Sequence, residues 1–486
     1  MRRVPETLVL LSLLCSLPLL AAPFDPAALQ AQLERGALRV SIPAGEVTIA
    51  LDIERTTRTA DGDLIVRARP AGVAERDGWA VLTQSSGHWY GNVRTGTRSY
   101  EIRHAGNGAH EIVERNADER APVDLPPAPS RRAAAIRDIR ADAATAVAEA
   151  EPVVVDVLMF YTSRLRSLVP EADIQTQAAA AVEEANLAYE RSGVAHRIRM
   201  VGLEETSYDE SLIAGLASWE AARARMVDPA DGFMDEMHTR RDALHADAVV
   251  LMIGRNDACG YATLMTAPPS RSFAPESFAL VAIQCAAREL TLAHELGHLM
   301  GLEHDRPGRV PGFEPAFPYA FGYRHPDDQF RTIMATEVAC AQRCKRISYF
   351  SNPGKTLDGQ PMGLDESDPQ AANNALALEQ TMPIMASFRE AAVPVVLLRS
   401  FSADRTEIES GQPVTLTWDT EGATTVTLSG TGPVAAQGSM TVTPSQSTTY
   451  TLTAQAGEVT ITSSVRVVVN CGDAPCASGK RRAVRH

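Results

Sequence analysis

The sequence predicts a multidomain protein with an α/β (α+β) domain in the middle, a β-rich region before it and a β-sandwich after it. Three observations support this prediction. The 486 residues are enough for about three domains of roughly 150 residues each. Strand-like and helix-like segments alternate across residues 152–390, which is typical of an α/β domain. Short apolar–polar alternations separated by Gly and Pro fill residues 23–116 and 396–470 instead.

The first 22 residues have the pattern of a secretory signal peptide. Arg2 and Arg3 give a positive start, an apolar run over residues 8–20 follows, and two alanines end the segment. The run is too short to cross a bilayer as a helix, and no later segment is apolar enough to do so. We therefore expect a secreted protein without a membrane anchor.

The net charge bears on the partners of the protein. At −14, it gives no electrostatic support for binding to nucleic acid, so we expect no nucleic-acid partner. Residues 471–486 form a small basic tail, which we expect to be a solvated terminus.

Export changes the interpretation of the seven cysteines. Cys15 would leave with the signal peptide, and an even number of cysteines outside the cytosol suggests disulfides. Six cysteines allow fifteen pairings. A metal site built from two of them, Cys340 and Cys344, is an alternative. Proximity in the sequence favours the pairs Cys259–Cys285, Cys340–Cys344 and Cys471–Cys476.

The region before the middle domain divides into two parts. Residues 23–116 contain alternating stretches such as ALRVSIPAG and DLIVRARP, which predict strands. Residues 117–151 are rich in Pro, Ala and Arg and contain no aromatic residue, which is typical of a linker. Its arginine pairs are plausible cleavage sites.

The middle region begins with a buried strand over residues 153–163 and continues with a helix that ends at Gly193. Further strands are predicted over residues 196–206, 246–254 and 277–285, with a helical segment over 232–244. The stretch NDACGYATLM (256–265) could supply an edge strand on which a peptide binds by β-augmentation, although an ordinary sheet edge has the same composition.

The C-terminal region, residues 396–470, predicts an Ig-like β-sandwich. Stretches such as PVTLTWDT and TTYTLTA have period two, and about seven such strands occur in some eighty residues. The array resembles the small Ig-like domains that are appended to many secreted bacterial enzymes. A surface, a carbohydrate or another protein is the kind of partner that such a domain would bind.

The stretch TLAHELGHLMGLEHD (291–305) holds three of the eleven histidines. On a helix, His294 and His298 lie on one face, and Glu295 lies one residue round from the first of them. Gly301 allows the left-handed turn that brings His304 back as a third ligand. Three nitrogens leave a fourth position for water, which is the arrangement of one catalytic zinc ion.

An amphipathic helix without a metal is the alternative for this stretch. Leu296, Leu299 and Leu302 would form its core side in either case. The alternative explains a bare HExxH but gives no reason for Gly301 and His304 at their positions. We therefore favour the zinc site.

The pattern HExxHxxGxxHD is the signature of the metzincin metalloproteases, and the chain resembles them over about residues 152–390. With Asp305 after the third histidine, the sequence resembles the reprolysin/adamalysin branch most. The resemblance implies a mixed sheet with an active-site helix and a tight "Met-turn" beneath the histidines, to which Met334 in FRTIMATEVAC matches. It also implies that RISYFSNPG (346–354) walls the pocket for the substrate side chain that follows the scissile bond.

The resemblance implies a secreted bacterial zinc endopeptidase that acts on proteins or peptides. Glu295 would be the general base that activates the zinc-bound water. Asp305 would support the ligands or stabilise the turn, although a solvated turn carboxylate would look the same. The chain would be made as a zymogen with residues 23–116 as its propeptide. No cysteine lies between the signal and the catalytic domain, so a propeptide thiol on the zinc is no model for its latency.

Other candidates are weaker. We expect the scattered histidines His196, His238, His245 and His325 to be surface or hydrogen-bonded side chains. The acidic stretches HPDDQF (325–330) and GLDESDP (363–369) could bind calcium, but solvated loops have the same composition. An exported binding or adhesion protein with a vestigial zinc site is the alternative function, against which the intact Glu295 argues.

Overall fold

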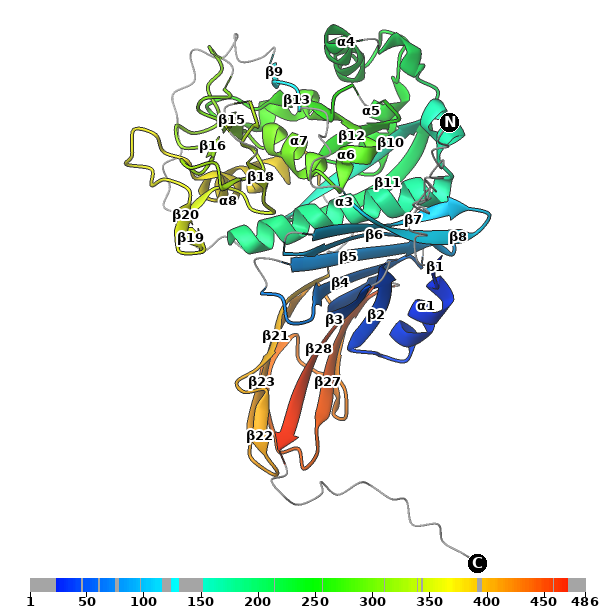
Figure 1. The fold of residues 1–486 in the computed structure, drawn as a ribbon. Helices are drawn as coiled ribbons and strands as arrows, with labels where there is room; N and C mark the ends of the chain where they lie inside the picture. Colours follow the sequence, from blue (N-terminus) through cyan, green and yellow to red (C-terminus); the bar gives the residue numbers. More distant parts are fainter. Residues whose placement is uncertain are drawn as a thin grey trace, which may run out of the picture.

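A six-stranded mixed sheet forms the core of the middle region (Figure 1). Its strands lie in the order β11-β10-β12-β14-β13-β9. The first four are parallel, and β13 runs antiparallel to β14. Strand β10 is buried along nearly its whole length, as its continuous apolar sequence predicts for a parallel strand covered on both faces. The bounds are β9 (Ala128–Pro129), β10 (Val154–Thr162), β11 (Arg197–Thr206), β12 (Ala248–Ile253), β13 (Gly260–Leu264) and β14 (Phe278–Ala282).

Helices cover this sheet. The longest, α3, ends at Gly193 with a left-handed φ of +81°, as the sequence predicts. Among the described residues, no helix is both long and apolar enough for a membrane span. The helices are α2 (Ser163–Leu168), α3 (Glu171–Ser192), α4 (Leu216–Val227), α5 (Glu236–Ala243), α6 (Ile283–Ala286), α7 (Thr291–Leu299) and α8 (Asn374–Met385), with 3-10 turns η1 (Glu210–Leu212) and η2 (Arg271–Glu276).

The segment between α7 and α8 is mostly irregular and is organised by three short strand pairs. Its own small core contains Phe321, Tyr323 and Phe330. The pairs are β15 (Glu303–Asp305) with β16 (Phe321–Gly322), β17 (Phe330–Arg331) with β18 (Lys345–Arg346), and β19 (Asn352–Leu357) with β20 (Gln360–Met362).

The computed structural model describes residues 23–44, 47–59, 62–74, 78–96, 98–115, 124–130, 152–213, 215–255, 257–309, 311–338, 340–341, 344–390, 396–457 and 459–470. The predicted signal peptide, the basic tail and the predicted pair Cys471–Cys476 lie outside these residues.

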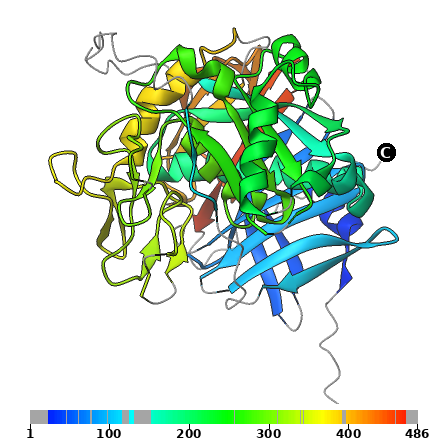
Figure 2. The same cartoon turned by 90° about the horizontal axis from the view of Figure 1, so that it is seen from above.

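The N-terminal region is an antiparallel sheet with one short helix (Figure 1). Seen from above, its blue strands emerge on one side from beneath the green middle region (Figure 2). Its elements are β1 (Pro23–Phe24), α1 (Pro26–Glu34), β2 (Arg39–Ala44), β3 (Val47–Arg58), β4 (Leu64–Pro70), β5 (Gly78–Ser85), β6 (His88–Thr95), β7 (Arg98–Gly106) and β8 (Ala109–Glu114).

Helix α3 lies across this N-terminal sheet and joins it by buried polar contacts (Figure 1). Arg67 forms ion pairs with Glu183 and Glu190, and the indole nitrogen of Trp79 donates to Glu184 at 2.8 Å. Apart from the half-exposed Glu190, these groups are largely shielded from water, so removal of Glu183 would leave the buried Arg67 with only a partly solvated partner. The N-terminal sheet is therefore tightly docked on the middle region.

The C-terminal region contains eight strands in two sheets around a core that includes Leu416, Trp418 and Leu452. Strand β28 pairs with β3, so one of the two sheets continues into the N-terminal sheet. The Ig-like assignment stays a prediction. The strands are β21 (Leu397–Ala403), β22 (Glu407–Glu409), β23 (Val414–Glu421), β24 (Thr425–Leu428), β25 (Gly432–Val434), β26 (Gln437–Val442), β27 (Thr448–Ala456) and β28 (Val459–Asn470).

Candidate active site

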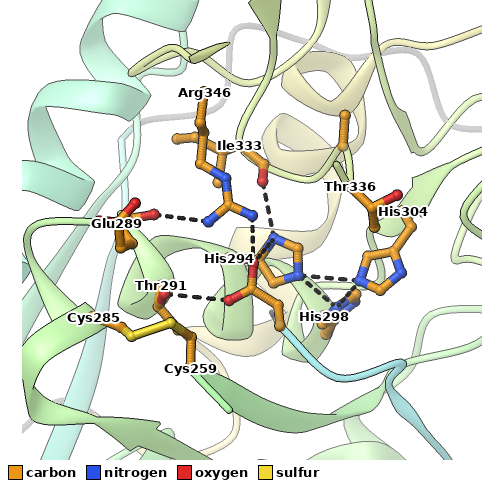
Figure 3. Close-up of polar contacts among 12 residues, drawn as sticks. Cys259, Cys285, Glu289, Thr291, His294, His298, His304, Ile333, Thr336 and Arg346 are labelled. Atoms are coloured by element: carbon orange, nitrogen blue, oxygen red, sulfur yellow. Dashed lines mark hydrogen bonds and ion pairs between the residues drawn. A yellow bond between two sulfur atoms is a disulfide. The ribbon is translucent and has the colours of Figure 1, made fainter. Parts of the chain in front are cut away.

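Three buried histidines meet at the end of α7 (Figure 3). His294 and His298 project from the same face of the helix, and His304 returns to them in β15. Their Nε2 atoms lie 3.1 Å apart for His294 and His304, and 3.2 Å apart for the other two pairs. We call these three residues the metal centre, because such a convergence of ring nitrogens is the ligand set that zinc prefers.

The remaining ring nitrogens fix the orientation of the three imidazoles. Nδ1 of His294 donates to the carbonyl of Ile333 at 2.9 Å, and Nδ1 of His298 donates to that of Leu302 at 2.8 Å. Burial lowers the pKa of His294 to about 3 and also lowers the pKa values of His298 and His304. The rings are thus neutral, with the Nε2 lone pairs directed at one another, as metal ligation requires.

The turn between the second and third histidines needs its glycine. Gly301 has a φ of +82°, and a Cβ there would overlap the side chain of Ala316 and lie 3.0 Å from the carbonyl oxygen of Met265. Both the conformation and the close approach exclude a side chain. The position predicted from the spacing of the histidines is therefore explained by the fold.

Glu295 is fully buried beside the metal centre, and neither of its carboxylate oxygens has a hydrogen-bond partner among the described residues. Burial raises its pKa well above the ordinary value for a glutamate. A Cβ at Gly260 of β13 would lie 2.6 Å from Glu295 Cδ, so any side chain at this strand position would displace the carboxylate. Gly260 was not singled out from the sequence, although a glycine in a strand often marks such a close approach.

Met334 and the residues that follow it contact both α7 and the strand that carries His304. Met334 is buried, and a Cβ at Gly297 of α7 would lie only 2.5 Å from its sulfur, so helix and turn are in close contact. Asp305 accepts hydrogen bonds from the backbone N–H of Thr336 at 2.9 Å and from its hydroxyl at 3.0 Å. Asp305 is buried, so the alternative of a solvated turn carboxylate is wrong. Gly297 was not singled out from the sequence.

Two disulfides are present among the described residues, and both were favoured by the sequence. Cys259–Cys285 joins the residue before β13 to α6, next to the start of α7 (Figure 3). Cys340–Cys344 closes a short loop after Met334. Because both sulfurs of that pair are bonded to each other, the alternative of a metal site with two thiolates is wrong.

The other candidate ligands form hydrogen bonds or ion pairs within the protein. For His196 and His238, the sequence predicted hydrogen-bonded side chains. His196 accepts from the N–H of Val153, and His238 contacts the carbonyl of Met226. In the acidic stretches, Asp328 is paired with Arg324 and Asp365 accepts from Ser367. These contacts give no support to a calcium site.

Residues 124–130, which the composition assigns to a linker, are seated on the middle region instead. They contain β9, which pairs in parallel with β13, and the N–H of Leu125 donates to the carbonyl of Gly260 at 3.1 Å. The carboxylate of Asp124 is held by the guanidinium of Arg346 and by the hydroxyl of Thr291 at 3.3 Å. Its Oδ2 atom lies 4.0 Å from Nδ1 of His294, so the segment reaches the metal centre.

Asp124 is largely shielded from water, yet it carries a full charge. Burial raises its pKa, but Arg346 outweighs that effect and holds the pKa far below the usual range. Arg331 is a second, partly buried cation in this group. We call Asp124, Thr291, Arg331 and Arg346 the Arg346 cluster. Of these four residues, only Arg346 lies in the segment 346–354, which was predicted to line the pocket for the substrate side chain that follows the scissile bond.

A mixed sheet, two histidines on one helix, a third in the strand that follows it and a buried glutamate beside them define a metallopeptidase, and comparison with known proteins agrees. A reprolysin-like model of Metallo-peptidase family M12 matches residues 151–351. The peptidyl-Asp metalloendopeptidase of Stenotrophomonas maltophilia (strain R551-3) is 31% identical over 67% of this chain and 74% of its own length. That of Xanthomonas campestris pv. campestris is 32% identical over 64% and 70%.

The chain belongs to metallopeptidase family M12 and is a metalloendopeptidase, whose substrates are proteins or peptides. Members of this family use zinc, and the three histidines are suited to hold it. A solved structure of metalloproteinase-II from Bacteroides fragilis has a TM-score of 0.34 and 11% identity over 57% of this chain and 85% of that one.

Proposed function

We propose that the protein is a secreted zinc endopeptidase, made as a zymogen, in which Glu295 acts as the general base. The observation that carries the proposal is the convergence of three neutral ring nitrogens, 3.1 to 3.2 Å apart, beside a buried carboxylate without a partner among the described residues. His294, His298 and His304 would hold one zinc ion, which when bound polarises the peptide carbonyl and acidifies the attacking water.

Glu295 is suited to move a proton in this reaction. Burial raises its pKa well above the ordinary glutamate value, so it can take a proton from the attacking water and keep it long enough to pass it on. The same carboxyl group would then deliver the proton to the leaving amine. Gly260 keeps the space beside this carboxylate free of a side chain. Asp305 and Met334 touch no substrate in this scheme and act by positioning the histidines.

The zymogen part of the proposal is supported by residues 124–130. They are paired with β13, the edge strand to which an extended peptide substrate would add by β-augmentation. A substrate cannot use the same backbone groups while this segment holds them. Cleavage in the arginine-containing stretch 131–140, followed by release of the N-terminal region, would free the strand. The predicted signal peptide and the two disulfides support secretion.

The preferred substrate is proposed from the relatives. Both carry names that specify peptidyl-Asp substrates. At 31% and 32% identity, these names support the same preference in this chain, namely cleavage of peptide bonds at aspartate.

The proposal is tested with the secreted protein, after its N-terminus has been determined, on a peptide library. We expect Glu295→Gln to lower kcat/KM by about 10²- to 10⁴-fold while the zinc content stays unchanged. A zinc chelator should abolish the activity of the wild type, and added zinc should restore it. Glu407→Gln, a change at an exposed glutamate of β22, is the matched control. Chelator-resistant cleavage, or a fully active Glu295→Gln variant, would contradict the mechanism.

A further inference from the structure

The guanidinium of Arg346 is fixed by two partners on opposite sides. One terminal nitrogen donates to the backbone carbonyl of Glu289 at 2.7 Å, and the other donates to the carboxylate of Asp124. Arg346 and Asp124 side chains are only 10% and 8% exposed. The contact to Glu289, just before α7, holds the arginine in place whatever group faces its other nitrogen. Arg346 is therefore a preset donor rather than a flexible surface side chain.

This donor lies beside the metal centre (Figure 3). Thr291, in the first turn of α7, is three residues before His294, and its hydroxyl contacts the second oxygen of the same carboxylate. Each oxygen of Asp124 thus has its own donor, and the carboxylate lies 4.0 Å from the ring of His294. An acidic side chain held there would place its backbone close to the metal centre.

The charges of the cluster also favour an anion. Arg331 donates to the carbonyl of Ala335, and the charge of Arg346 acts on its partly buried guanidinium. Apart from Asp124, the acid that acts on both arginines is Glu289, whose carboxylate also pairs with Arg288. Asp124 precedes the catalytic region, so release of the N-terminal region would remove it. Arg346 would then lose the carboxylate that it contacts, and only the more distant charges of Glu289 and, for Arg331, Glu337 would remain. The loss of a contacting anion from a buried guanidinium is costly unless another anion replaces it.

We propose that Arg346, together with Thr291, determines substrate specificity by receiving the acidic side chain of the substrate, and that Asp124 occupies this position in the full chain. The inference rests on the proposed endopeptidase function and names the residues that select its substrate. Asp124 is accordingly an internal mimic of the substrate side chain.

The contacts discriminate between acidic and neutral side chains. An asparagine could keep its carbonyl oxygen toward Arg346 and donate its NH2 group to the hydroxyl of Thr291. The discrimination therefore depends on the bond to Arg346, which a neutral amide oxygen accepts more weakly than a carboxylate. Hydrogen bonds to charged groups are the stronger ones, so we expect a preference for aspartate over asparagine of about 10- to 100-fold. Glutamate should rank between them. The bond from Leu125 to Gly260 fixes the backbone next to the carboxylate, so a longer side chain would have to fold back.

The first test measures binding without turnover. The processed protein carrying Glu295→Gln, from which the N-terminal region with residues 124–130 has been removed, is titrated with a labelled peptide that contains one aspartate, and with its asparagine analogue, by fluorescence anisotropy. We expect the aspartate peptide to bind about 10- to 100-fold tighter, and Arg346→Gln to reduce this ratio to nearly one. Arg346→Lys should restore part of it, and Arg240→Gln, at an exposed ion pair, should leave it unchanged. In the full chain, where residues 124–130 hold β13 and Asp124 holds Arg346, both peptides should bind weakly.

The second test uses the secreted, processed enzyme with Glu295 intact and measures turnover. Arg346→Gln should lower kcat/KM for the aspartate peptide by about 10- to 100-fold and leave that for the asparagine peptide within about threefold. Equal losses on both peptides, or an undiminished preference, would overturn the assignment. A chain that binds aspartate selectively but cleaves nothing, with Glu295 intact, would instead overturn the endopeptidase function and leave the assignment of Arg346 standing.

Discussion

The metal centre and the Arg346 cluster are neighbours, but they are built from different parts of the chain. The metal centre and its supports come from one region, residues 260–336, with His294, His298 and His304 inside eleven positions. The Arg346 cluster joins Asp124 to Arg346 across 222 positions. It also contacts the N-terminal sheet, because Arg94 of β6 donates to the carbonyl of Arg346 at 3.5 Å.

This difference teaches that the reaction and the choice of substrate depend on separate parts of the molecule. The groups that would hold zinc and move a proton obtain their positions from α7, β13 and the turn at Met334. The position beside Arg346, which would receive the substrate side chain, is occupied by Asp124 from a segment that follows the N-terminal sheet. Changes in the metal centre should therefore affect all substrates alike, whereas changes in the Arg346 cluster should alter their ranking.

The largest expected effect comes from removing a ligand. His298→Ala should abolish stoichiometric zinc binding and lower kcat/KM by at least about 10³-fold on aspartate and asparagine peptides alike, because metal ions supply several kcal/mol of transition-state stabilisation. Zinc content by mass spectrometry and the two kcat/KM values check this. Arg346→Gln is the contrasting variant and should retain its zinc. A His298→Ala enzyme that lost activity on only one of the peptides would break the comparison.

The sequence predicts the two sites to very different degrees, for a physical reason. The metal centre could be predicted from the sequence because helix periodicity and one glycine determine its geometry within a dozen residues. Asp124 has no such local signal, since it lies in a stretch whose composition is that of a linker, and its role depends on a contact made only by the fold. Gly260 is intermediate, because a glycine within the strand-like NDACGYATLM indicates a close approach but not the residue that approaches.

An effect of intermediate size is expected from Asp305, which follows His304 and accepts hydrogen bonds from Thr336 in the chain after Met334. Asp305→Ala removes both bonds to Thr336, and the loss of buried hydrogen bonds to a charged group should cost about 1–3 kcal/mol of unfolding free energy. Zinc affinity should fall by about 10- to 100-fold, as for other residues that support metal ligands. Thermal unfolding and zinc titration with a competing chelator measure the two effects.

Asp305→Asn is the matched control, because an amide oxygen can still accept from the N–H of Thr336. Its losses should be smaller than those of Asp305→Ala. Neither variant should change the ratio of aspartate to asparagine cleavage. A shift of that ratio would show that the two parts of the site are coupled more closely than their contacts indicate.

The smallest effect concerns the N-terminal sheet and its dependence on pH. Glu184 of α3 accepts from Trp79 of β5, and burial raises the pKa of Glu184 to about 7 from 4.5. Between pH 4.5 and 7, Glu184 is protonated in the folded state but ionised in the unfolded state. The free energy of unfolding therefore falls as the pH rises from about 4.5 to 7 and then levels off. The total change should be about 1–3 kcal/mol.

Hydrogen exchange, corrected for intrinsic chemistry, resolves which part of the molecule this proton stabilises. Protection of β5 should decrease from pH 4.5 to 7, and protection of residues 124–130 should decrease with it, because the N-terminal sheet contacts the chain beside Arg346. Helix α7 should keep its protection, since it takes its position from the middle region. Glu184→Gln retains an acceptor for Trp79 and has no charge to titrate, so it should flatten this pH profile. If α7 lost protection in parallel with β5, the metal centre would depend on the N-terminal sheet after all, and the separation between reaction and selection would fail.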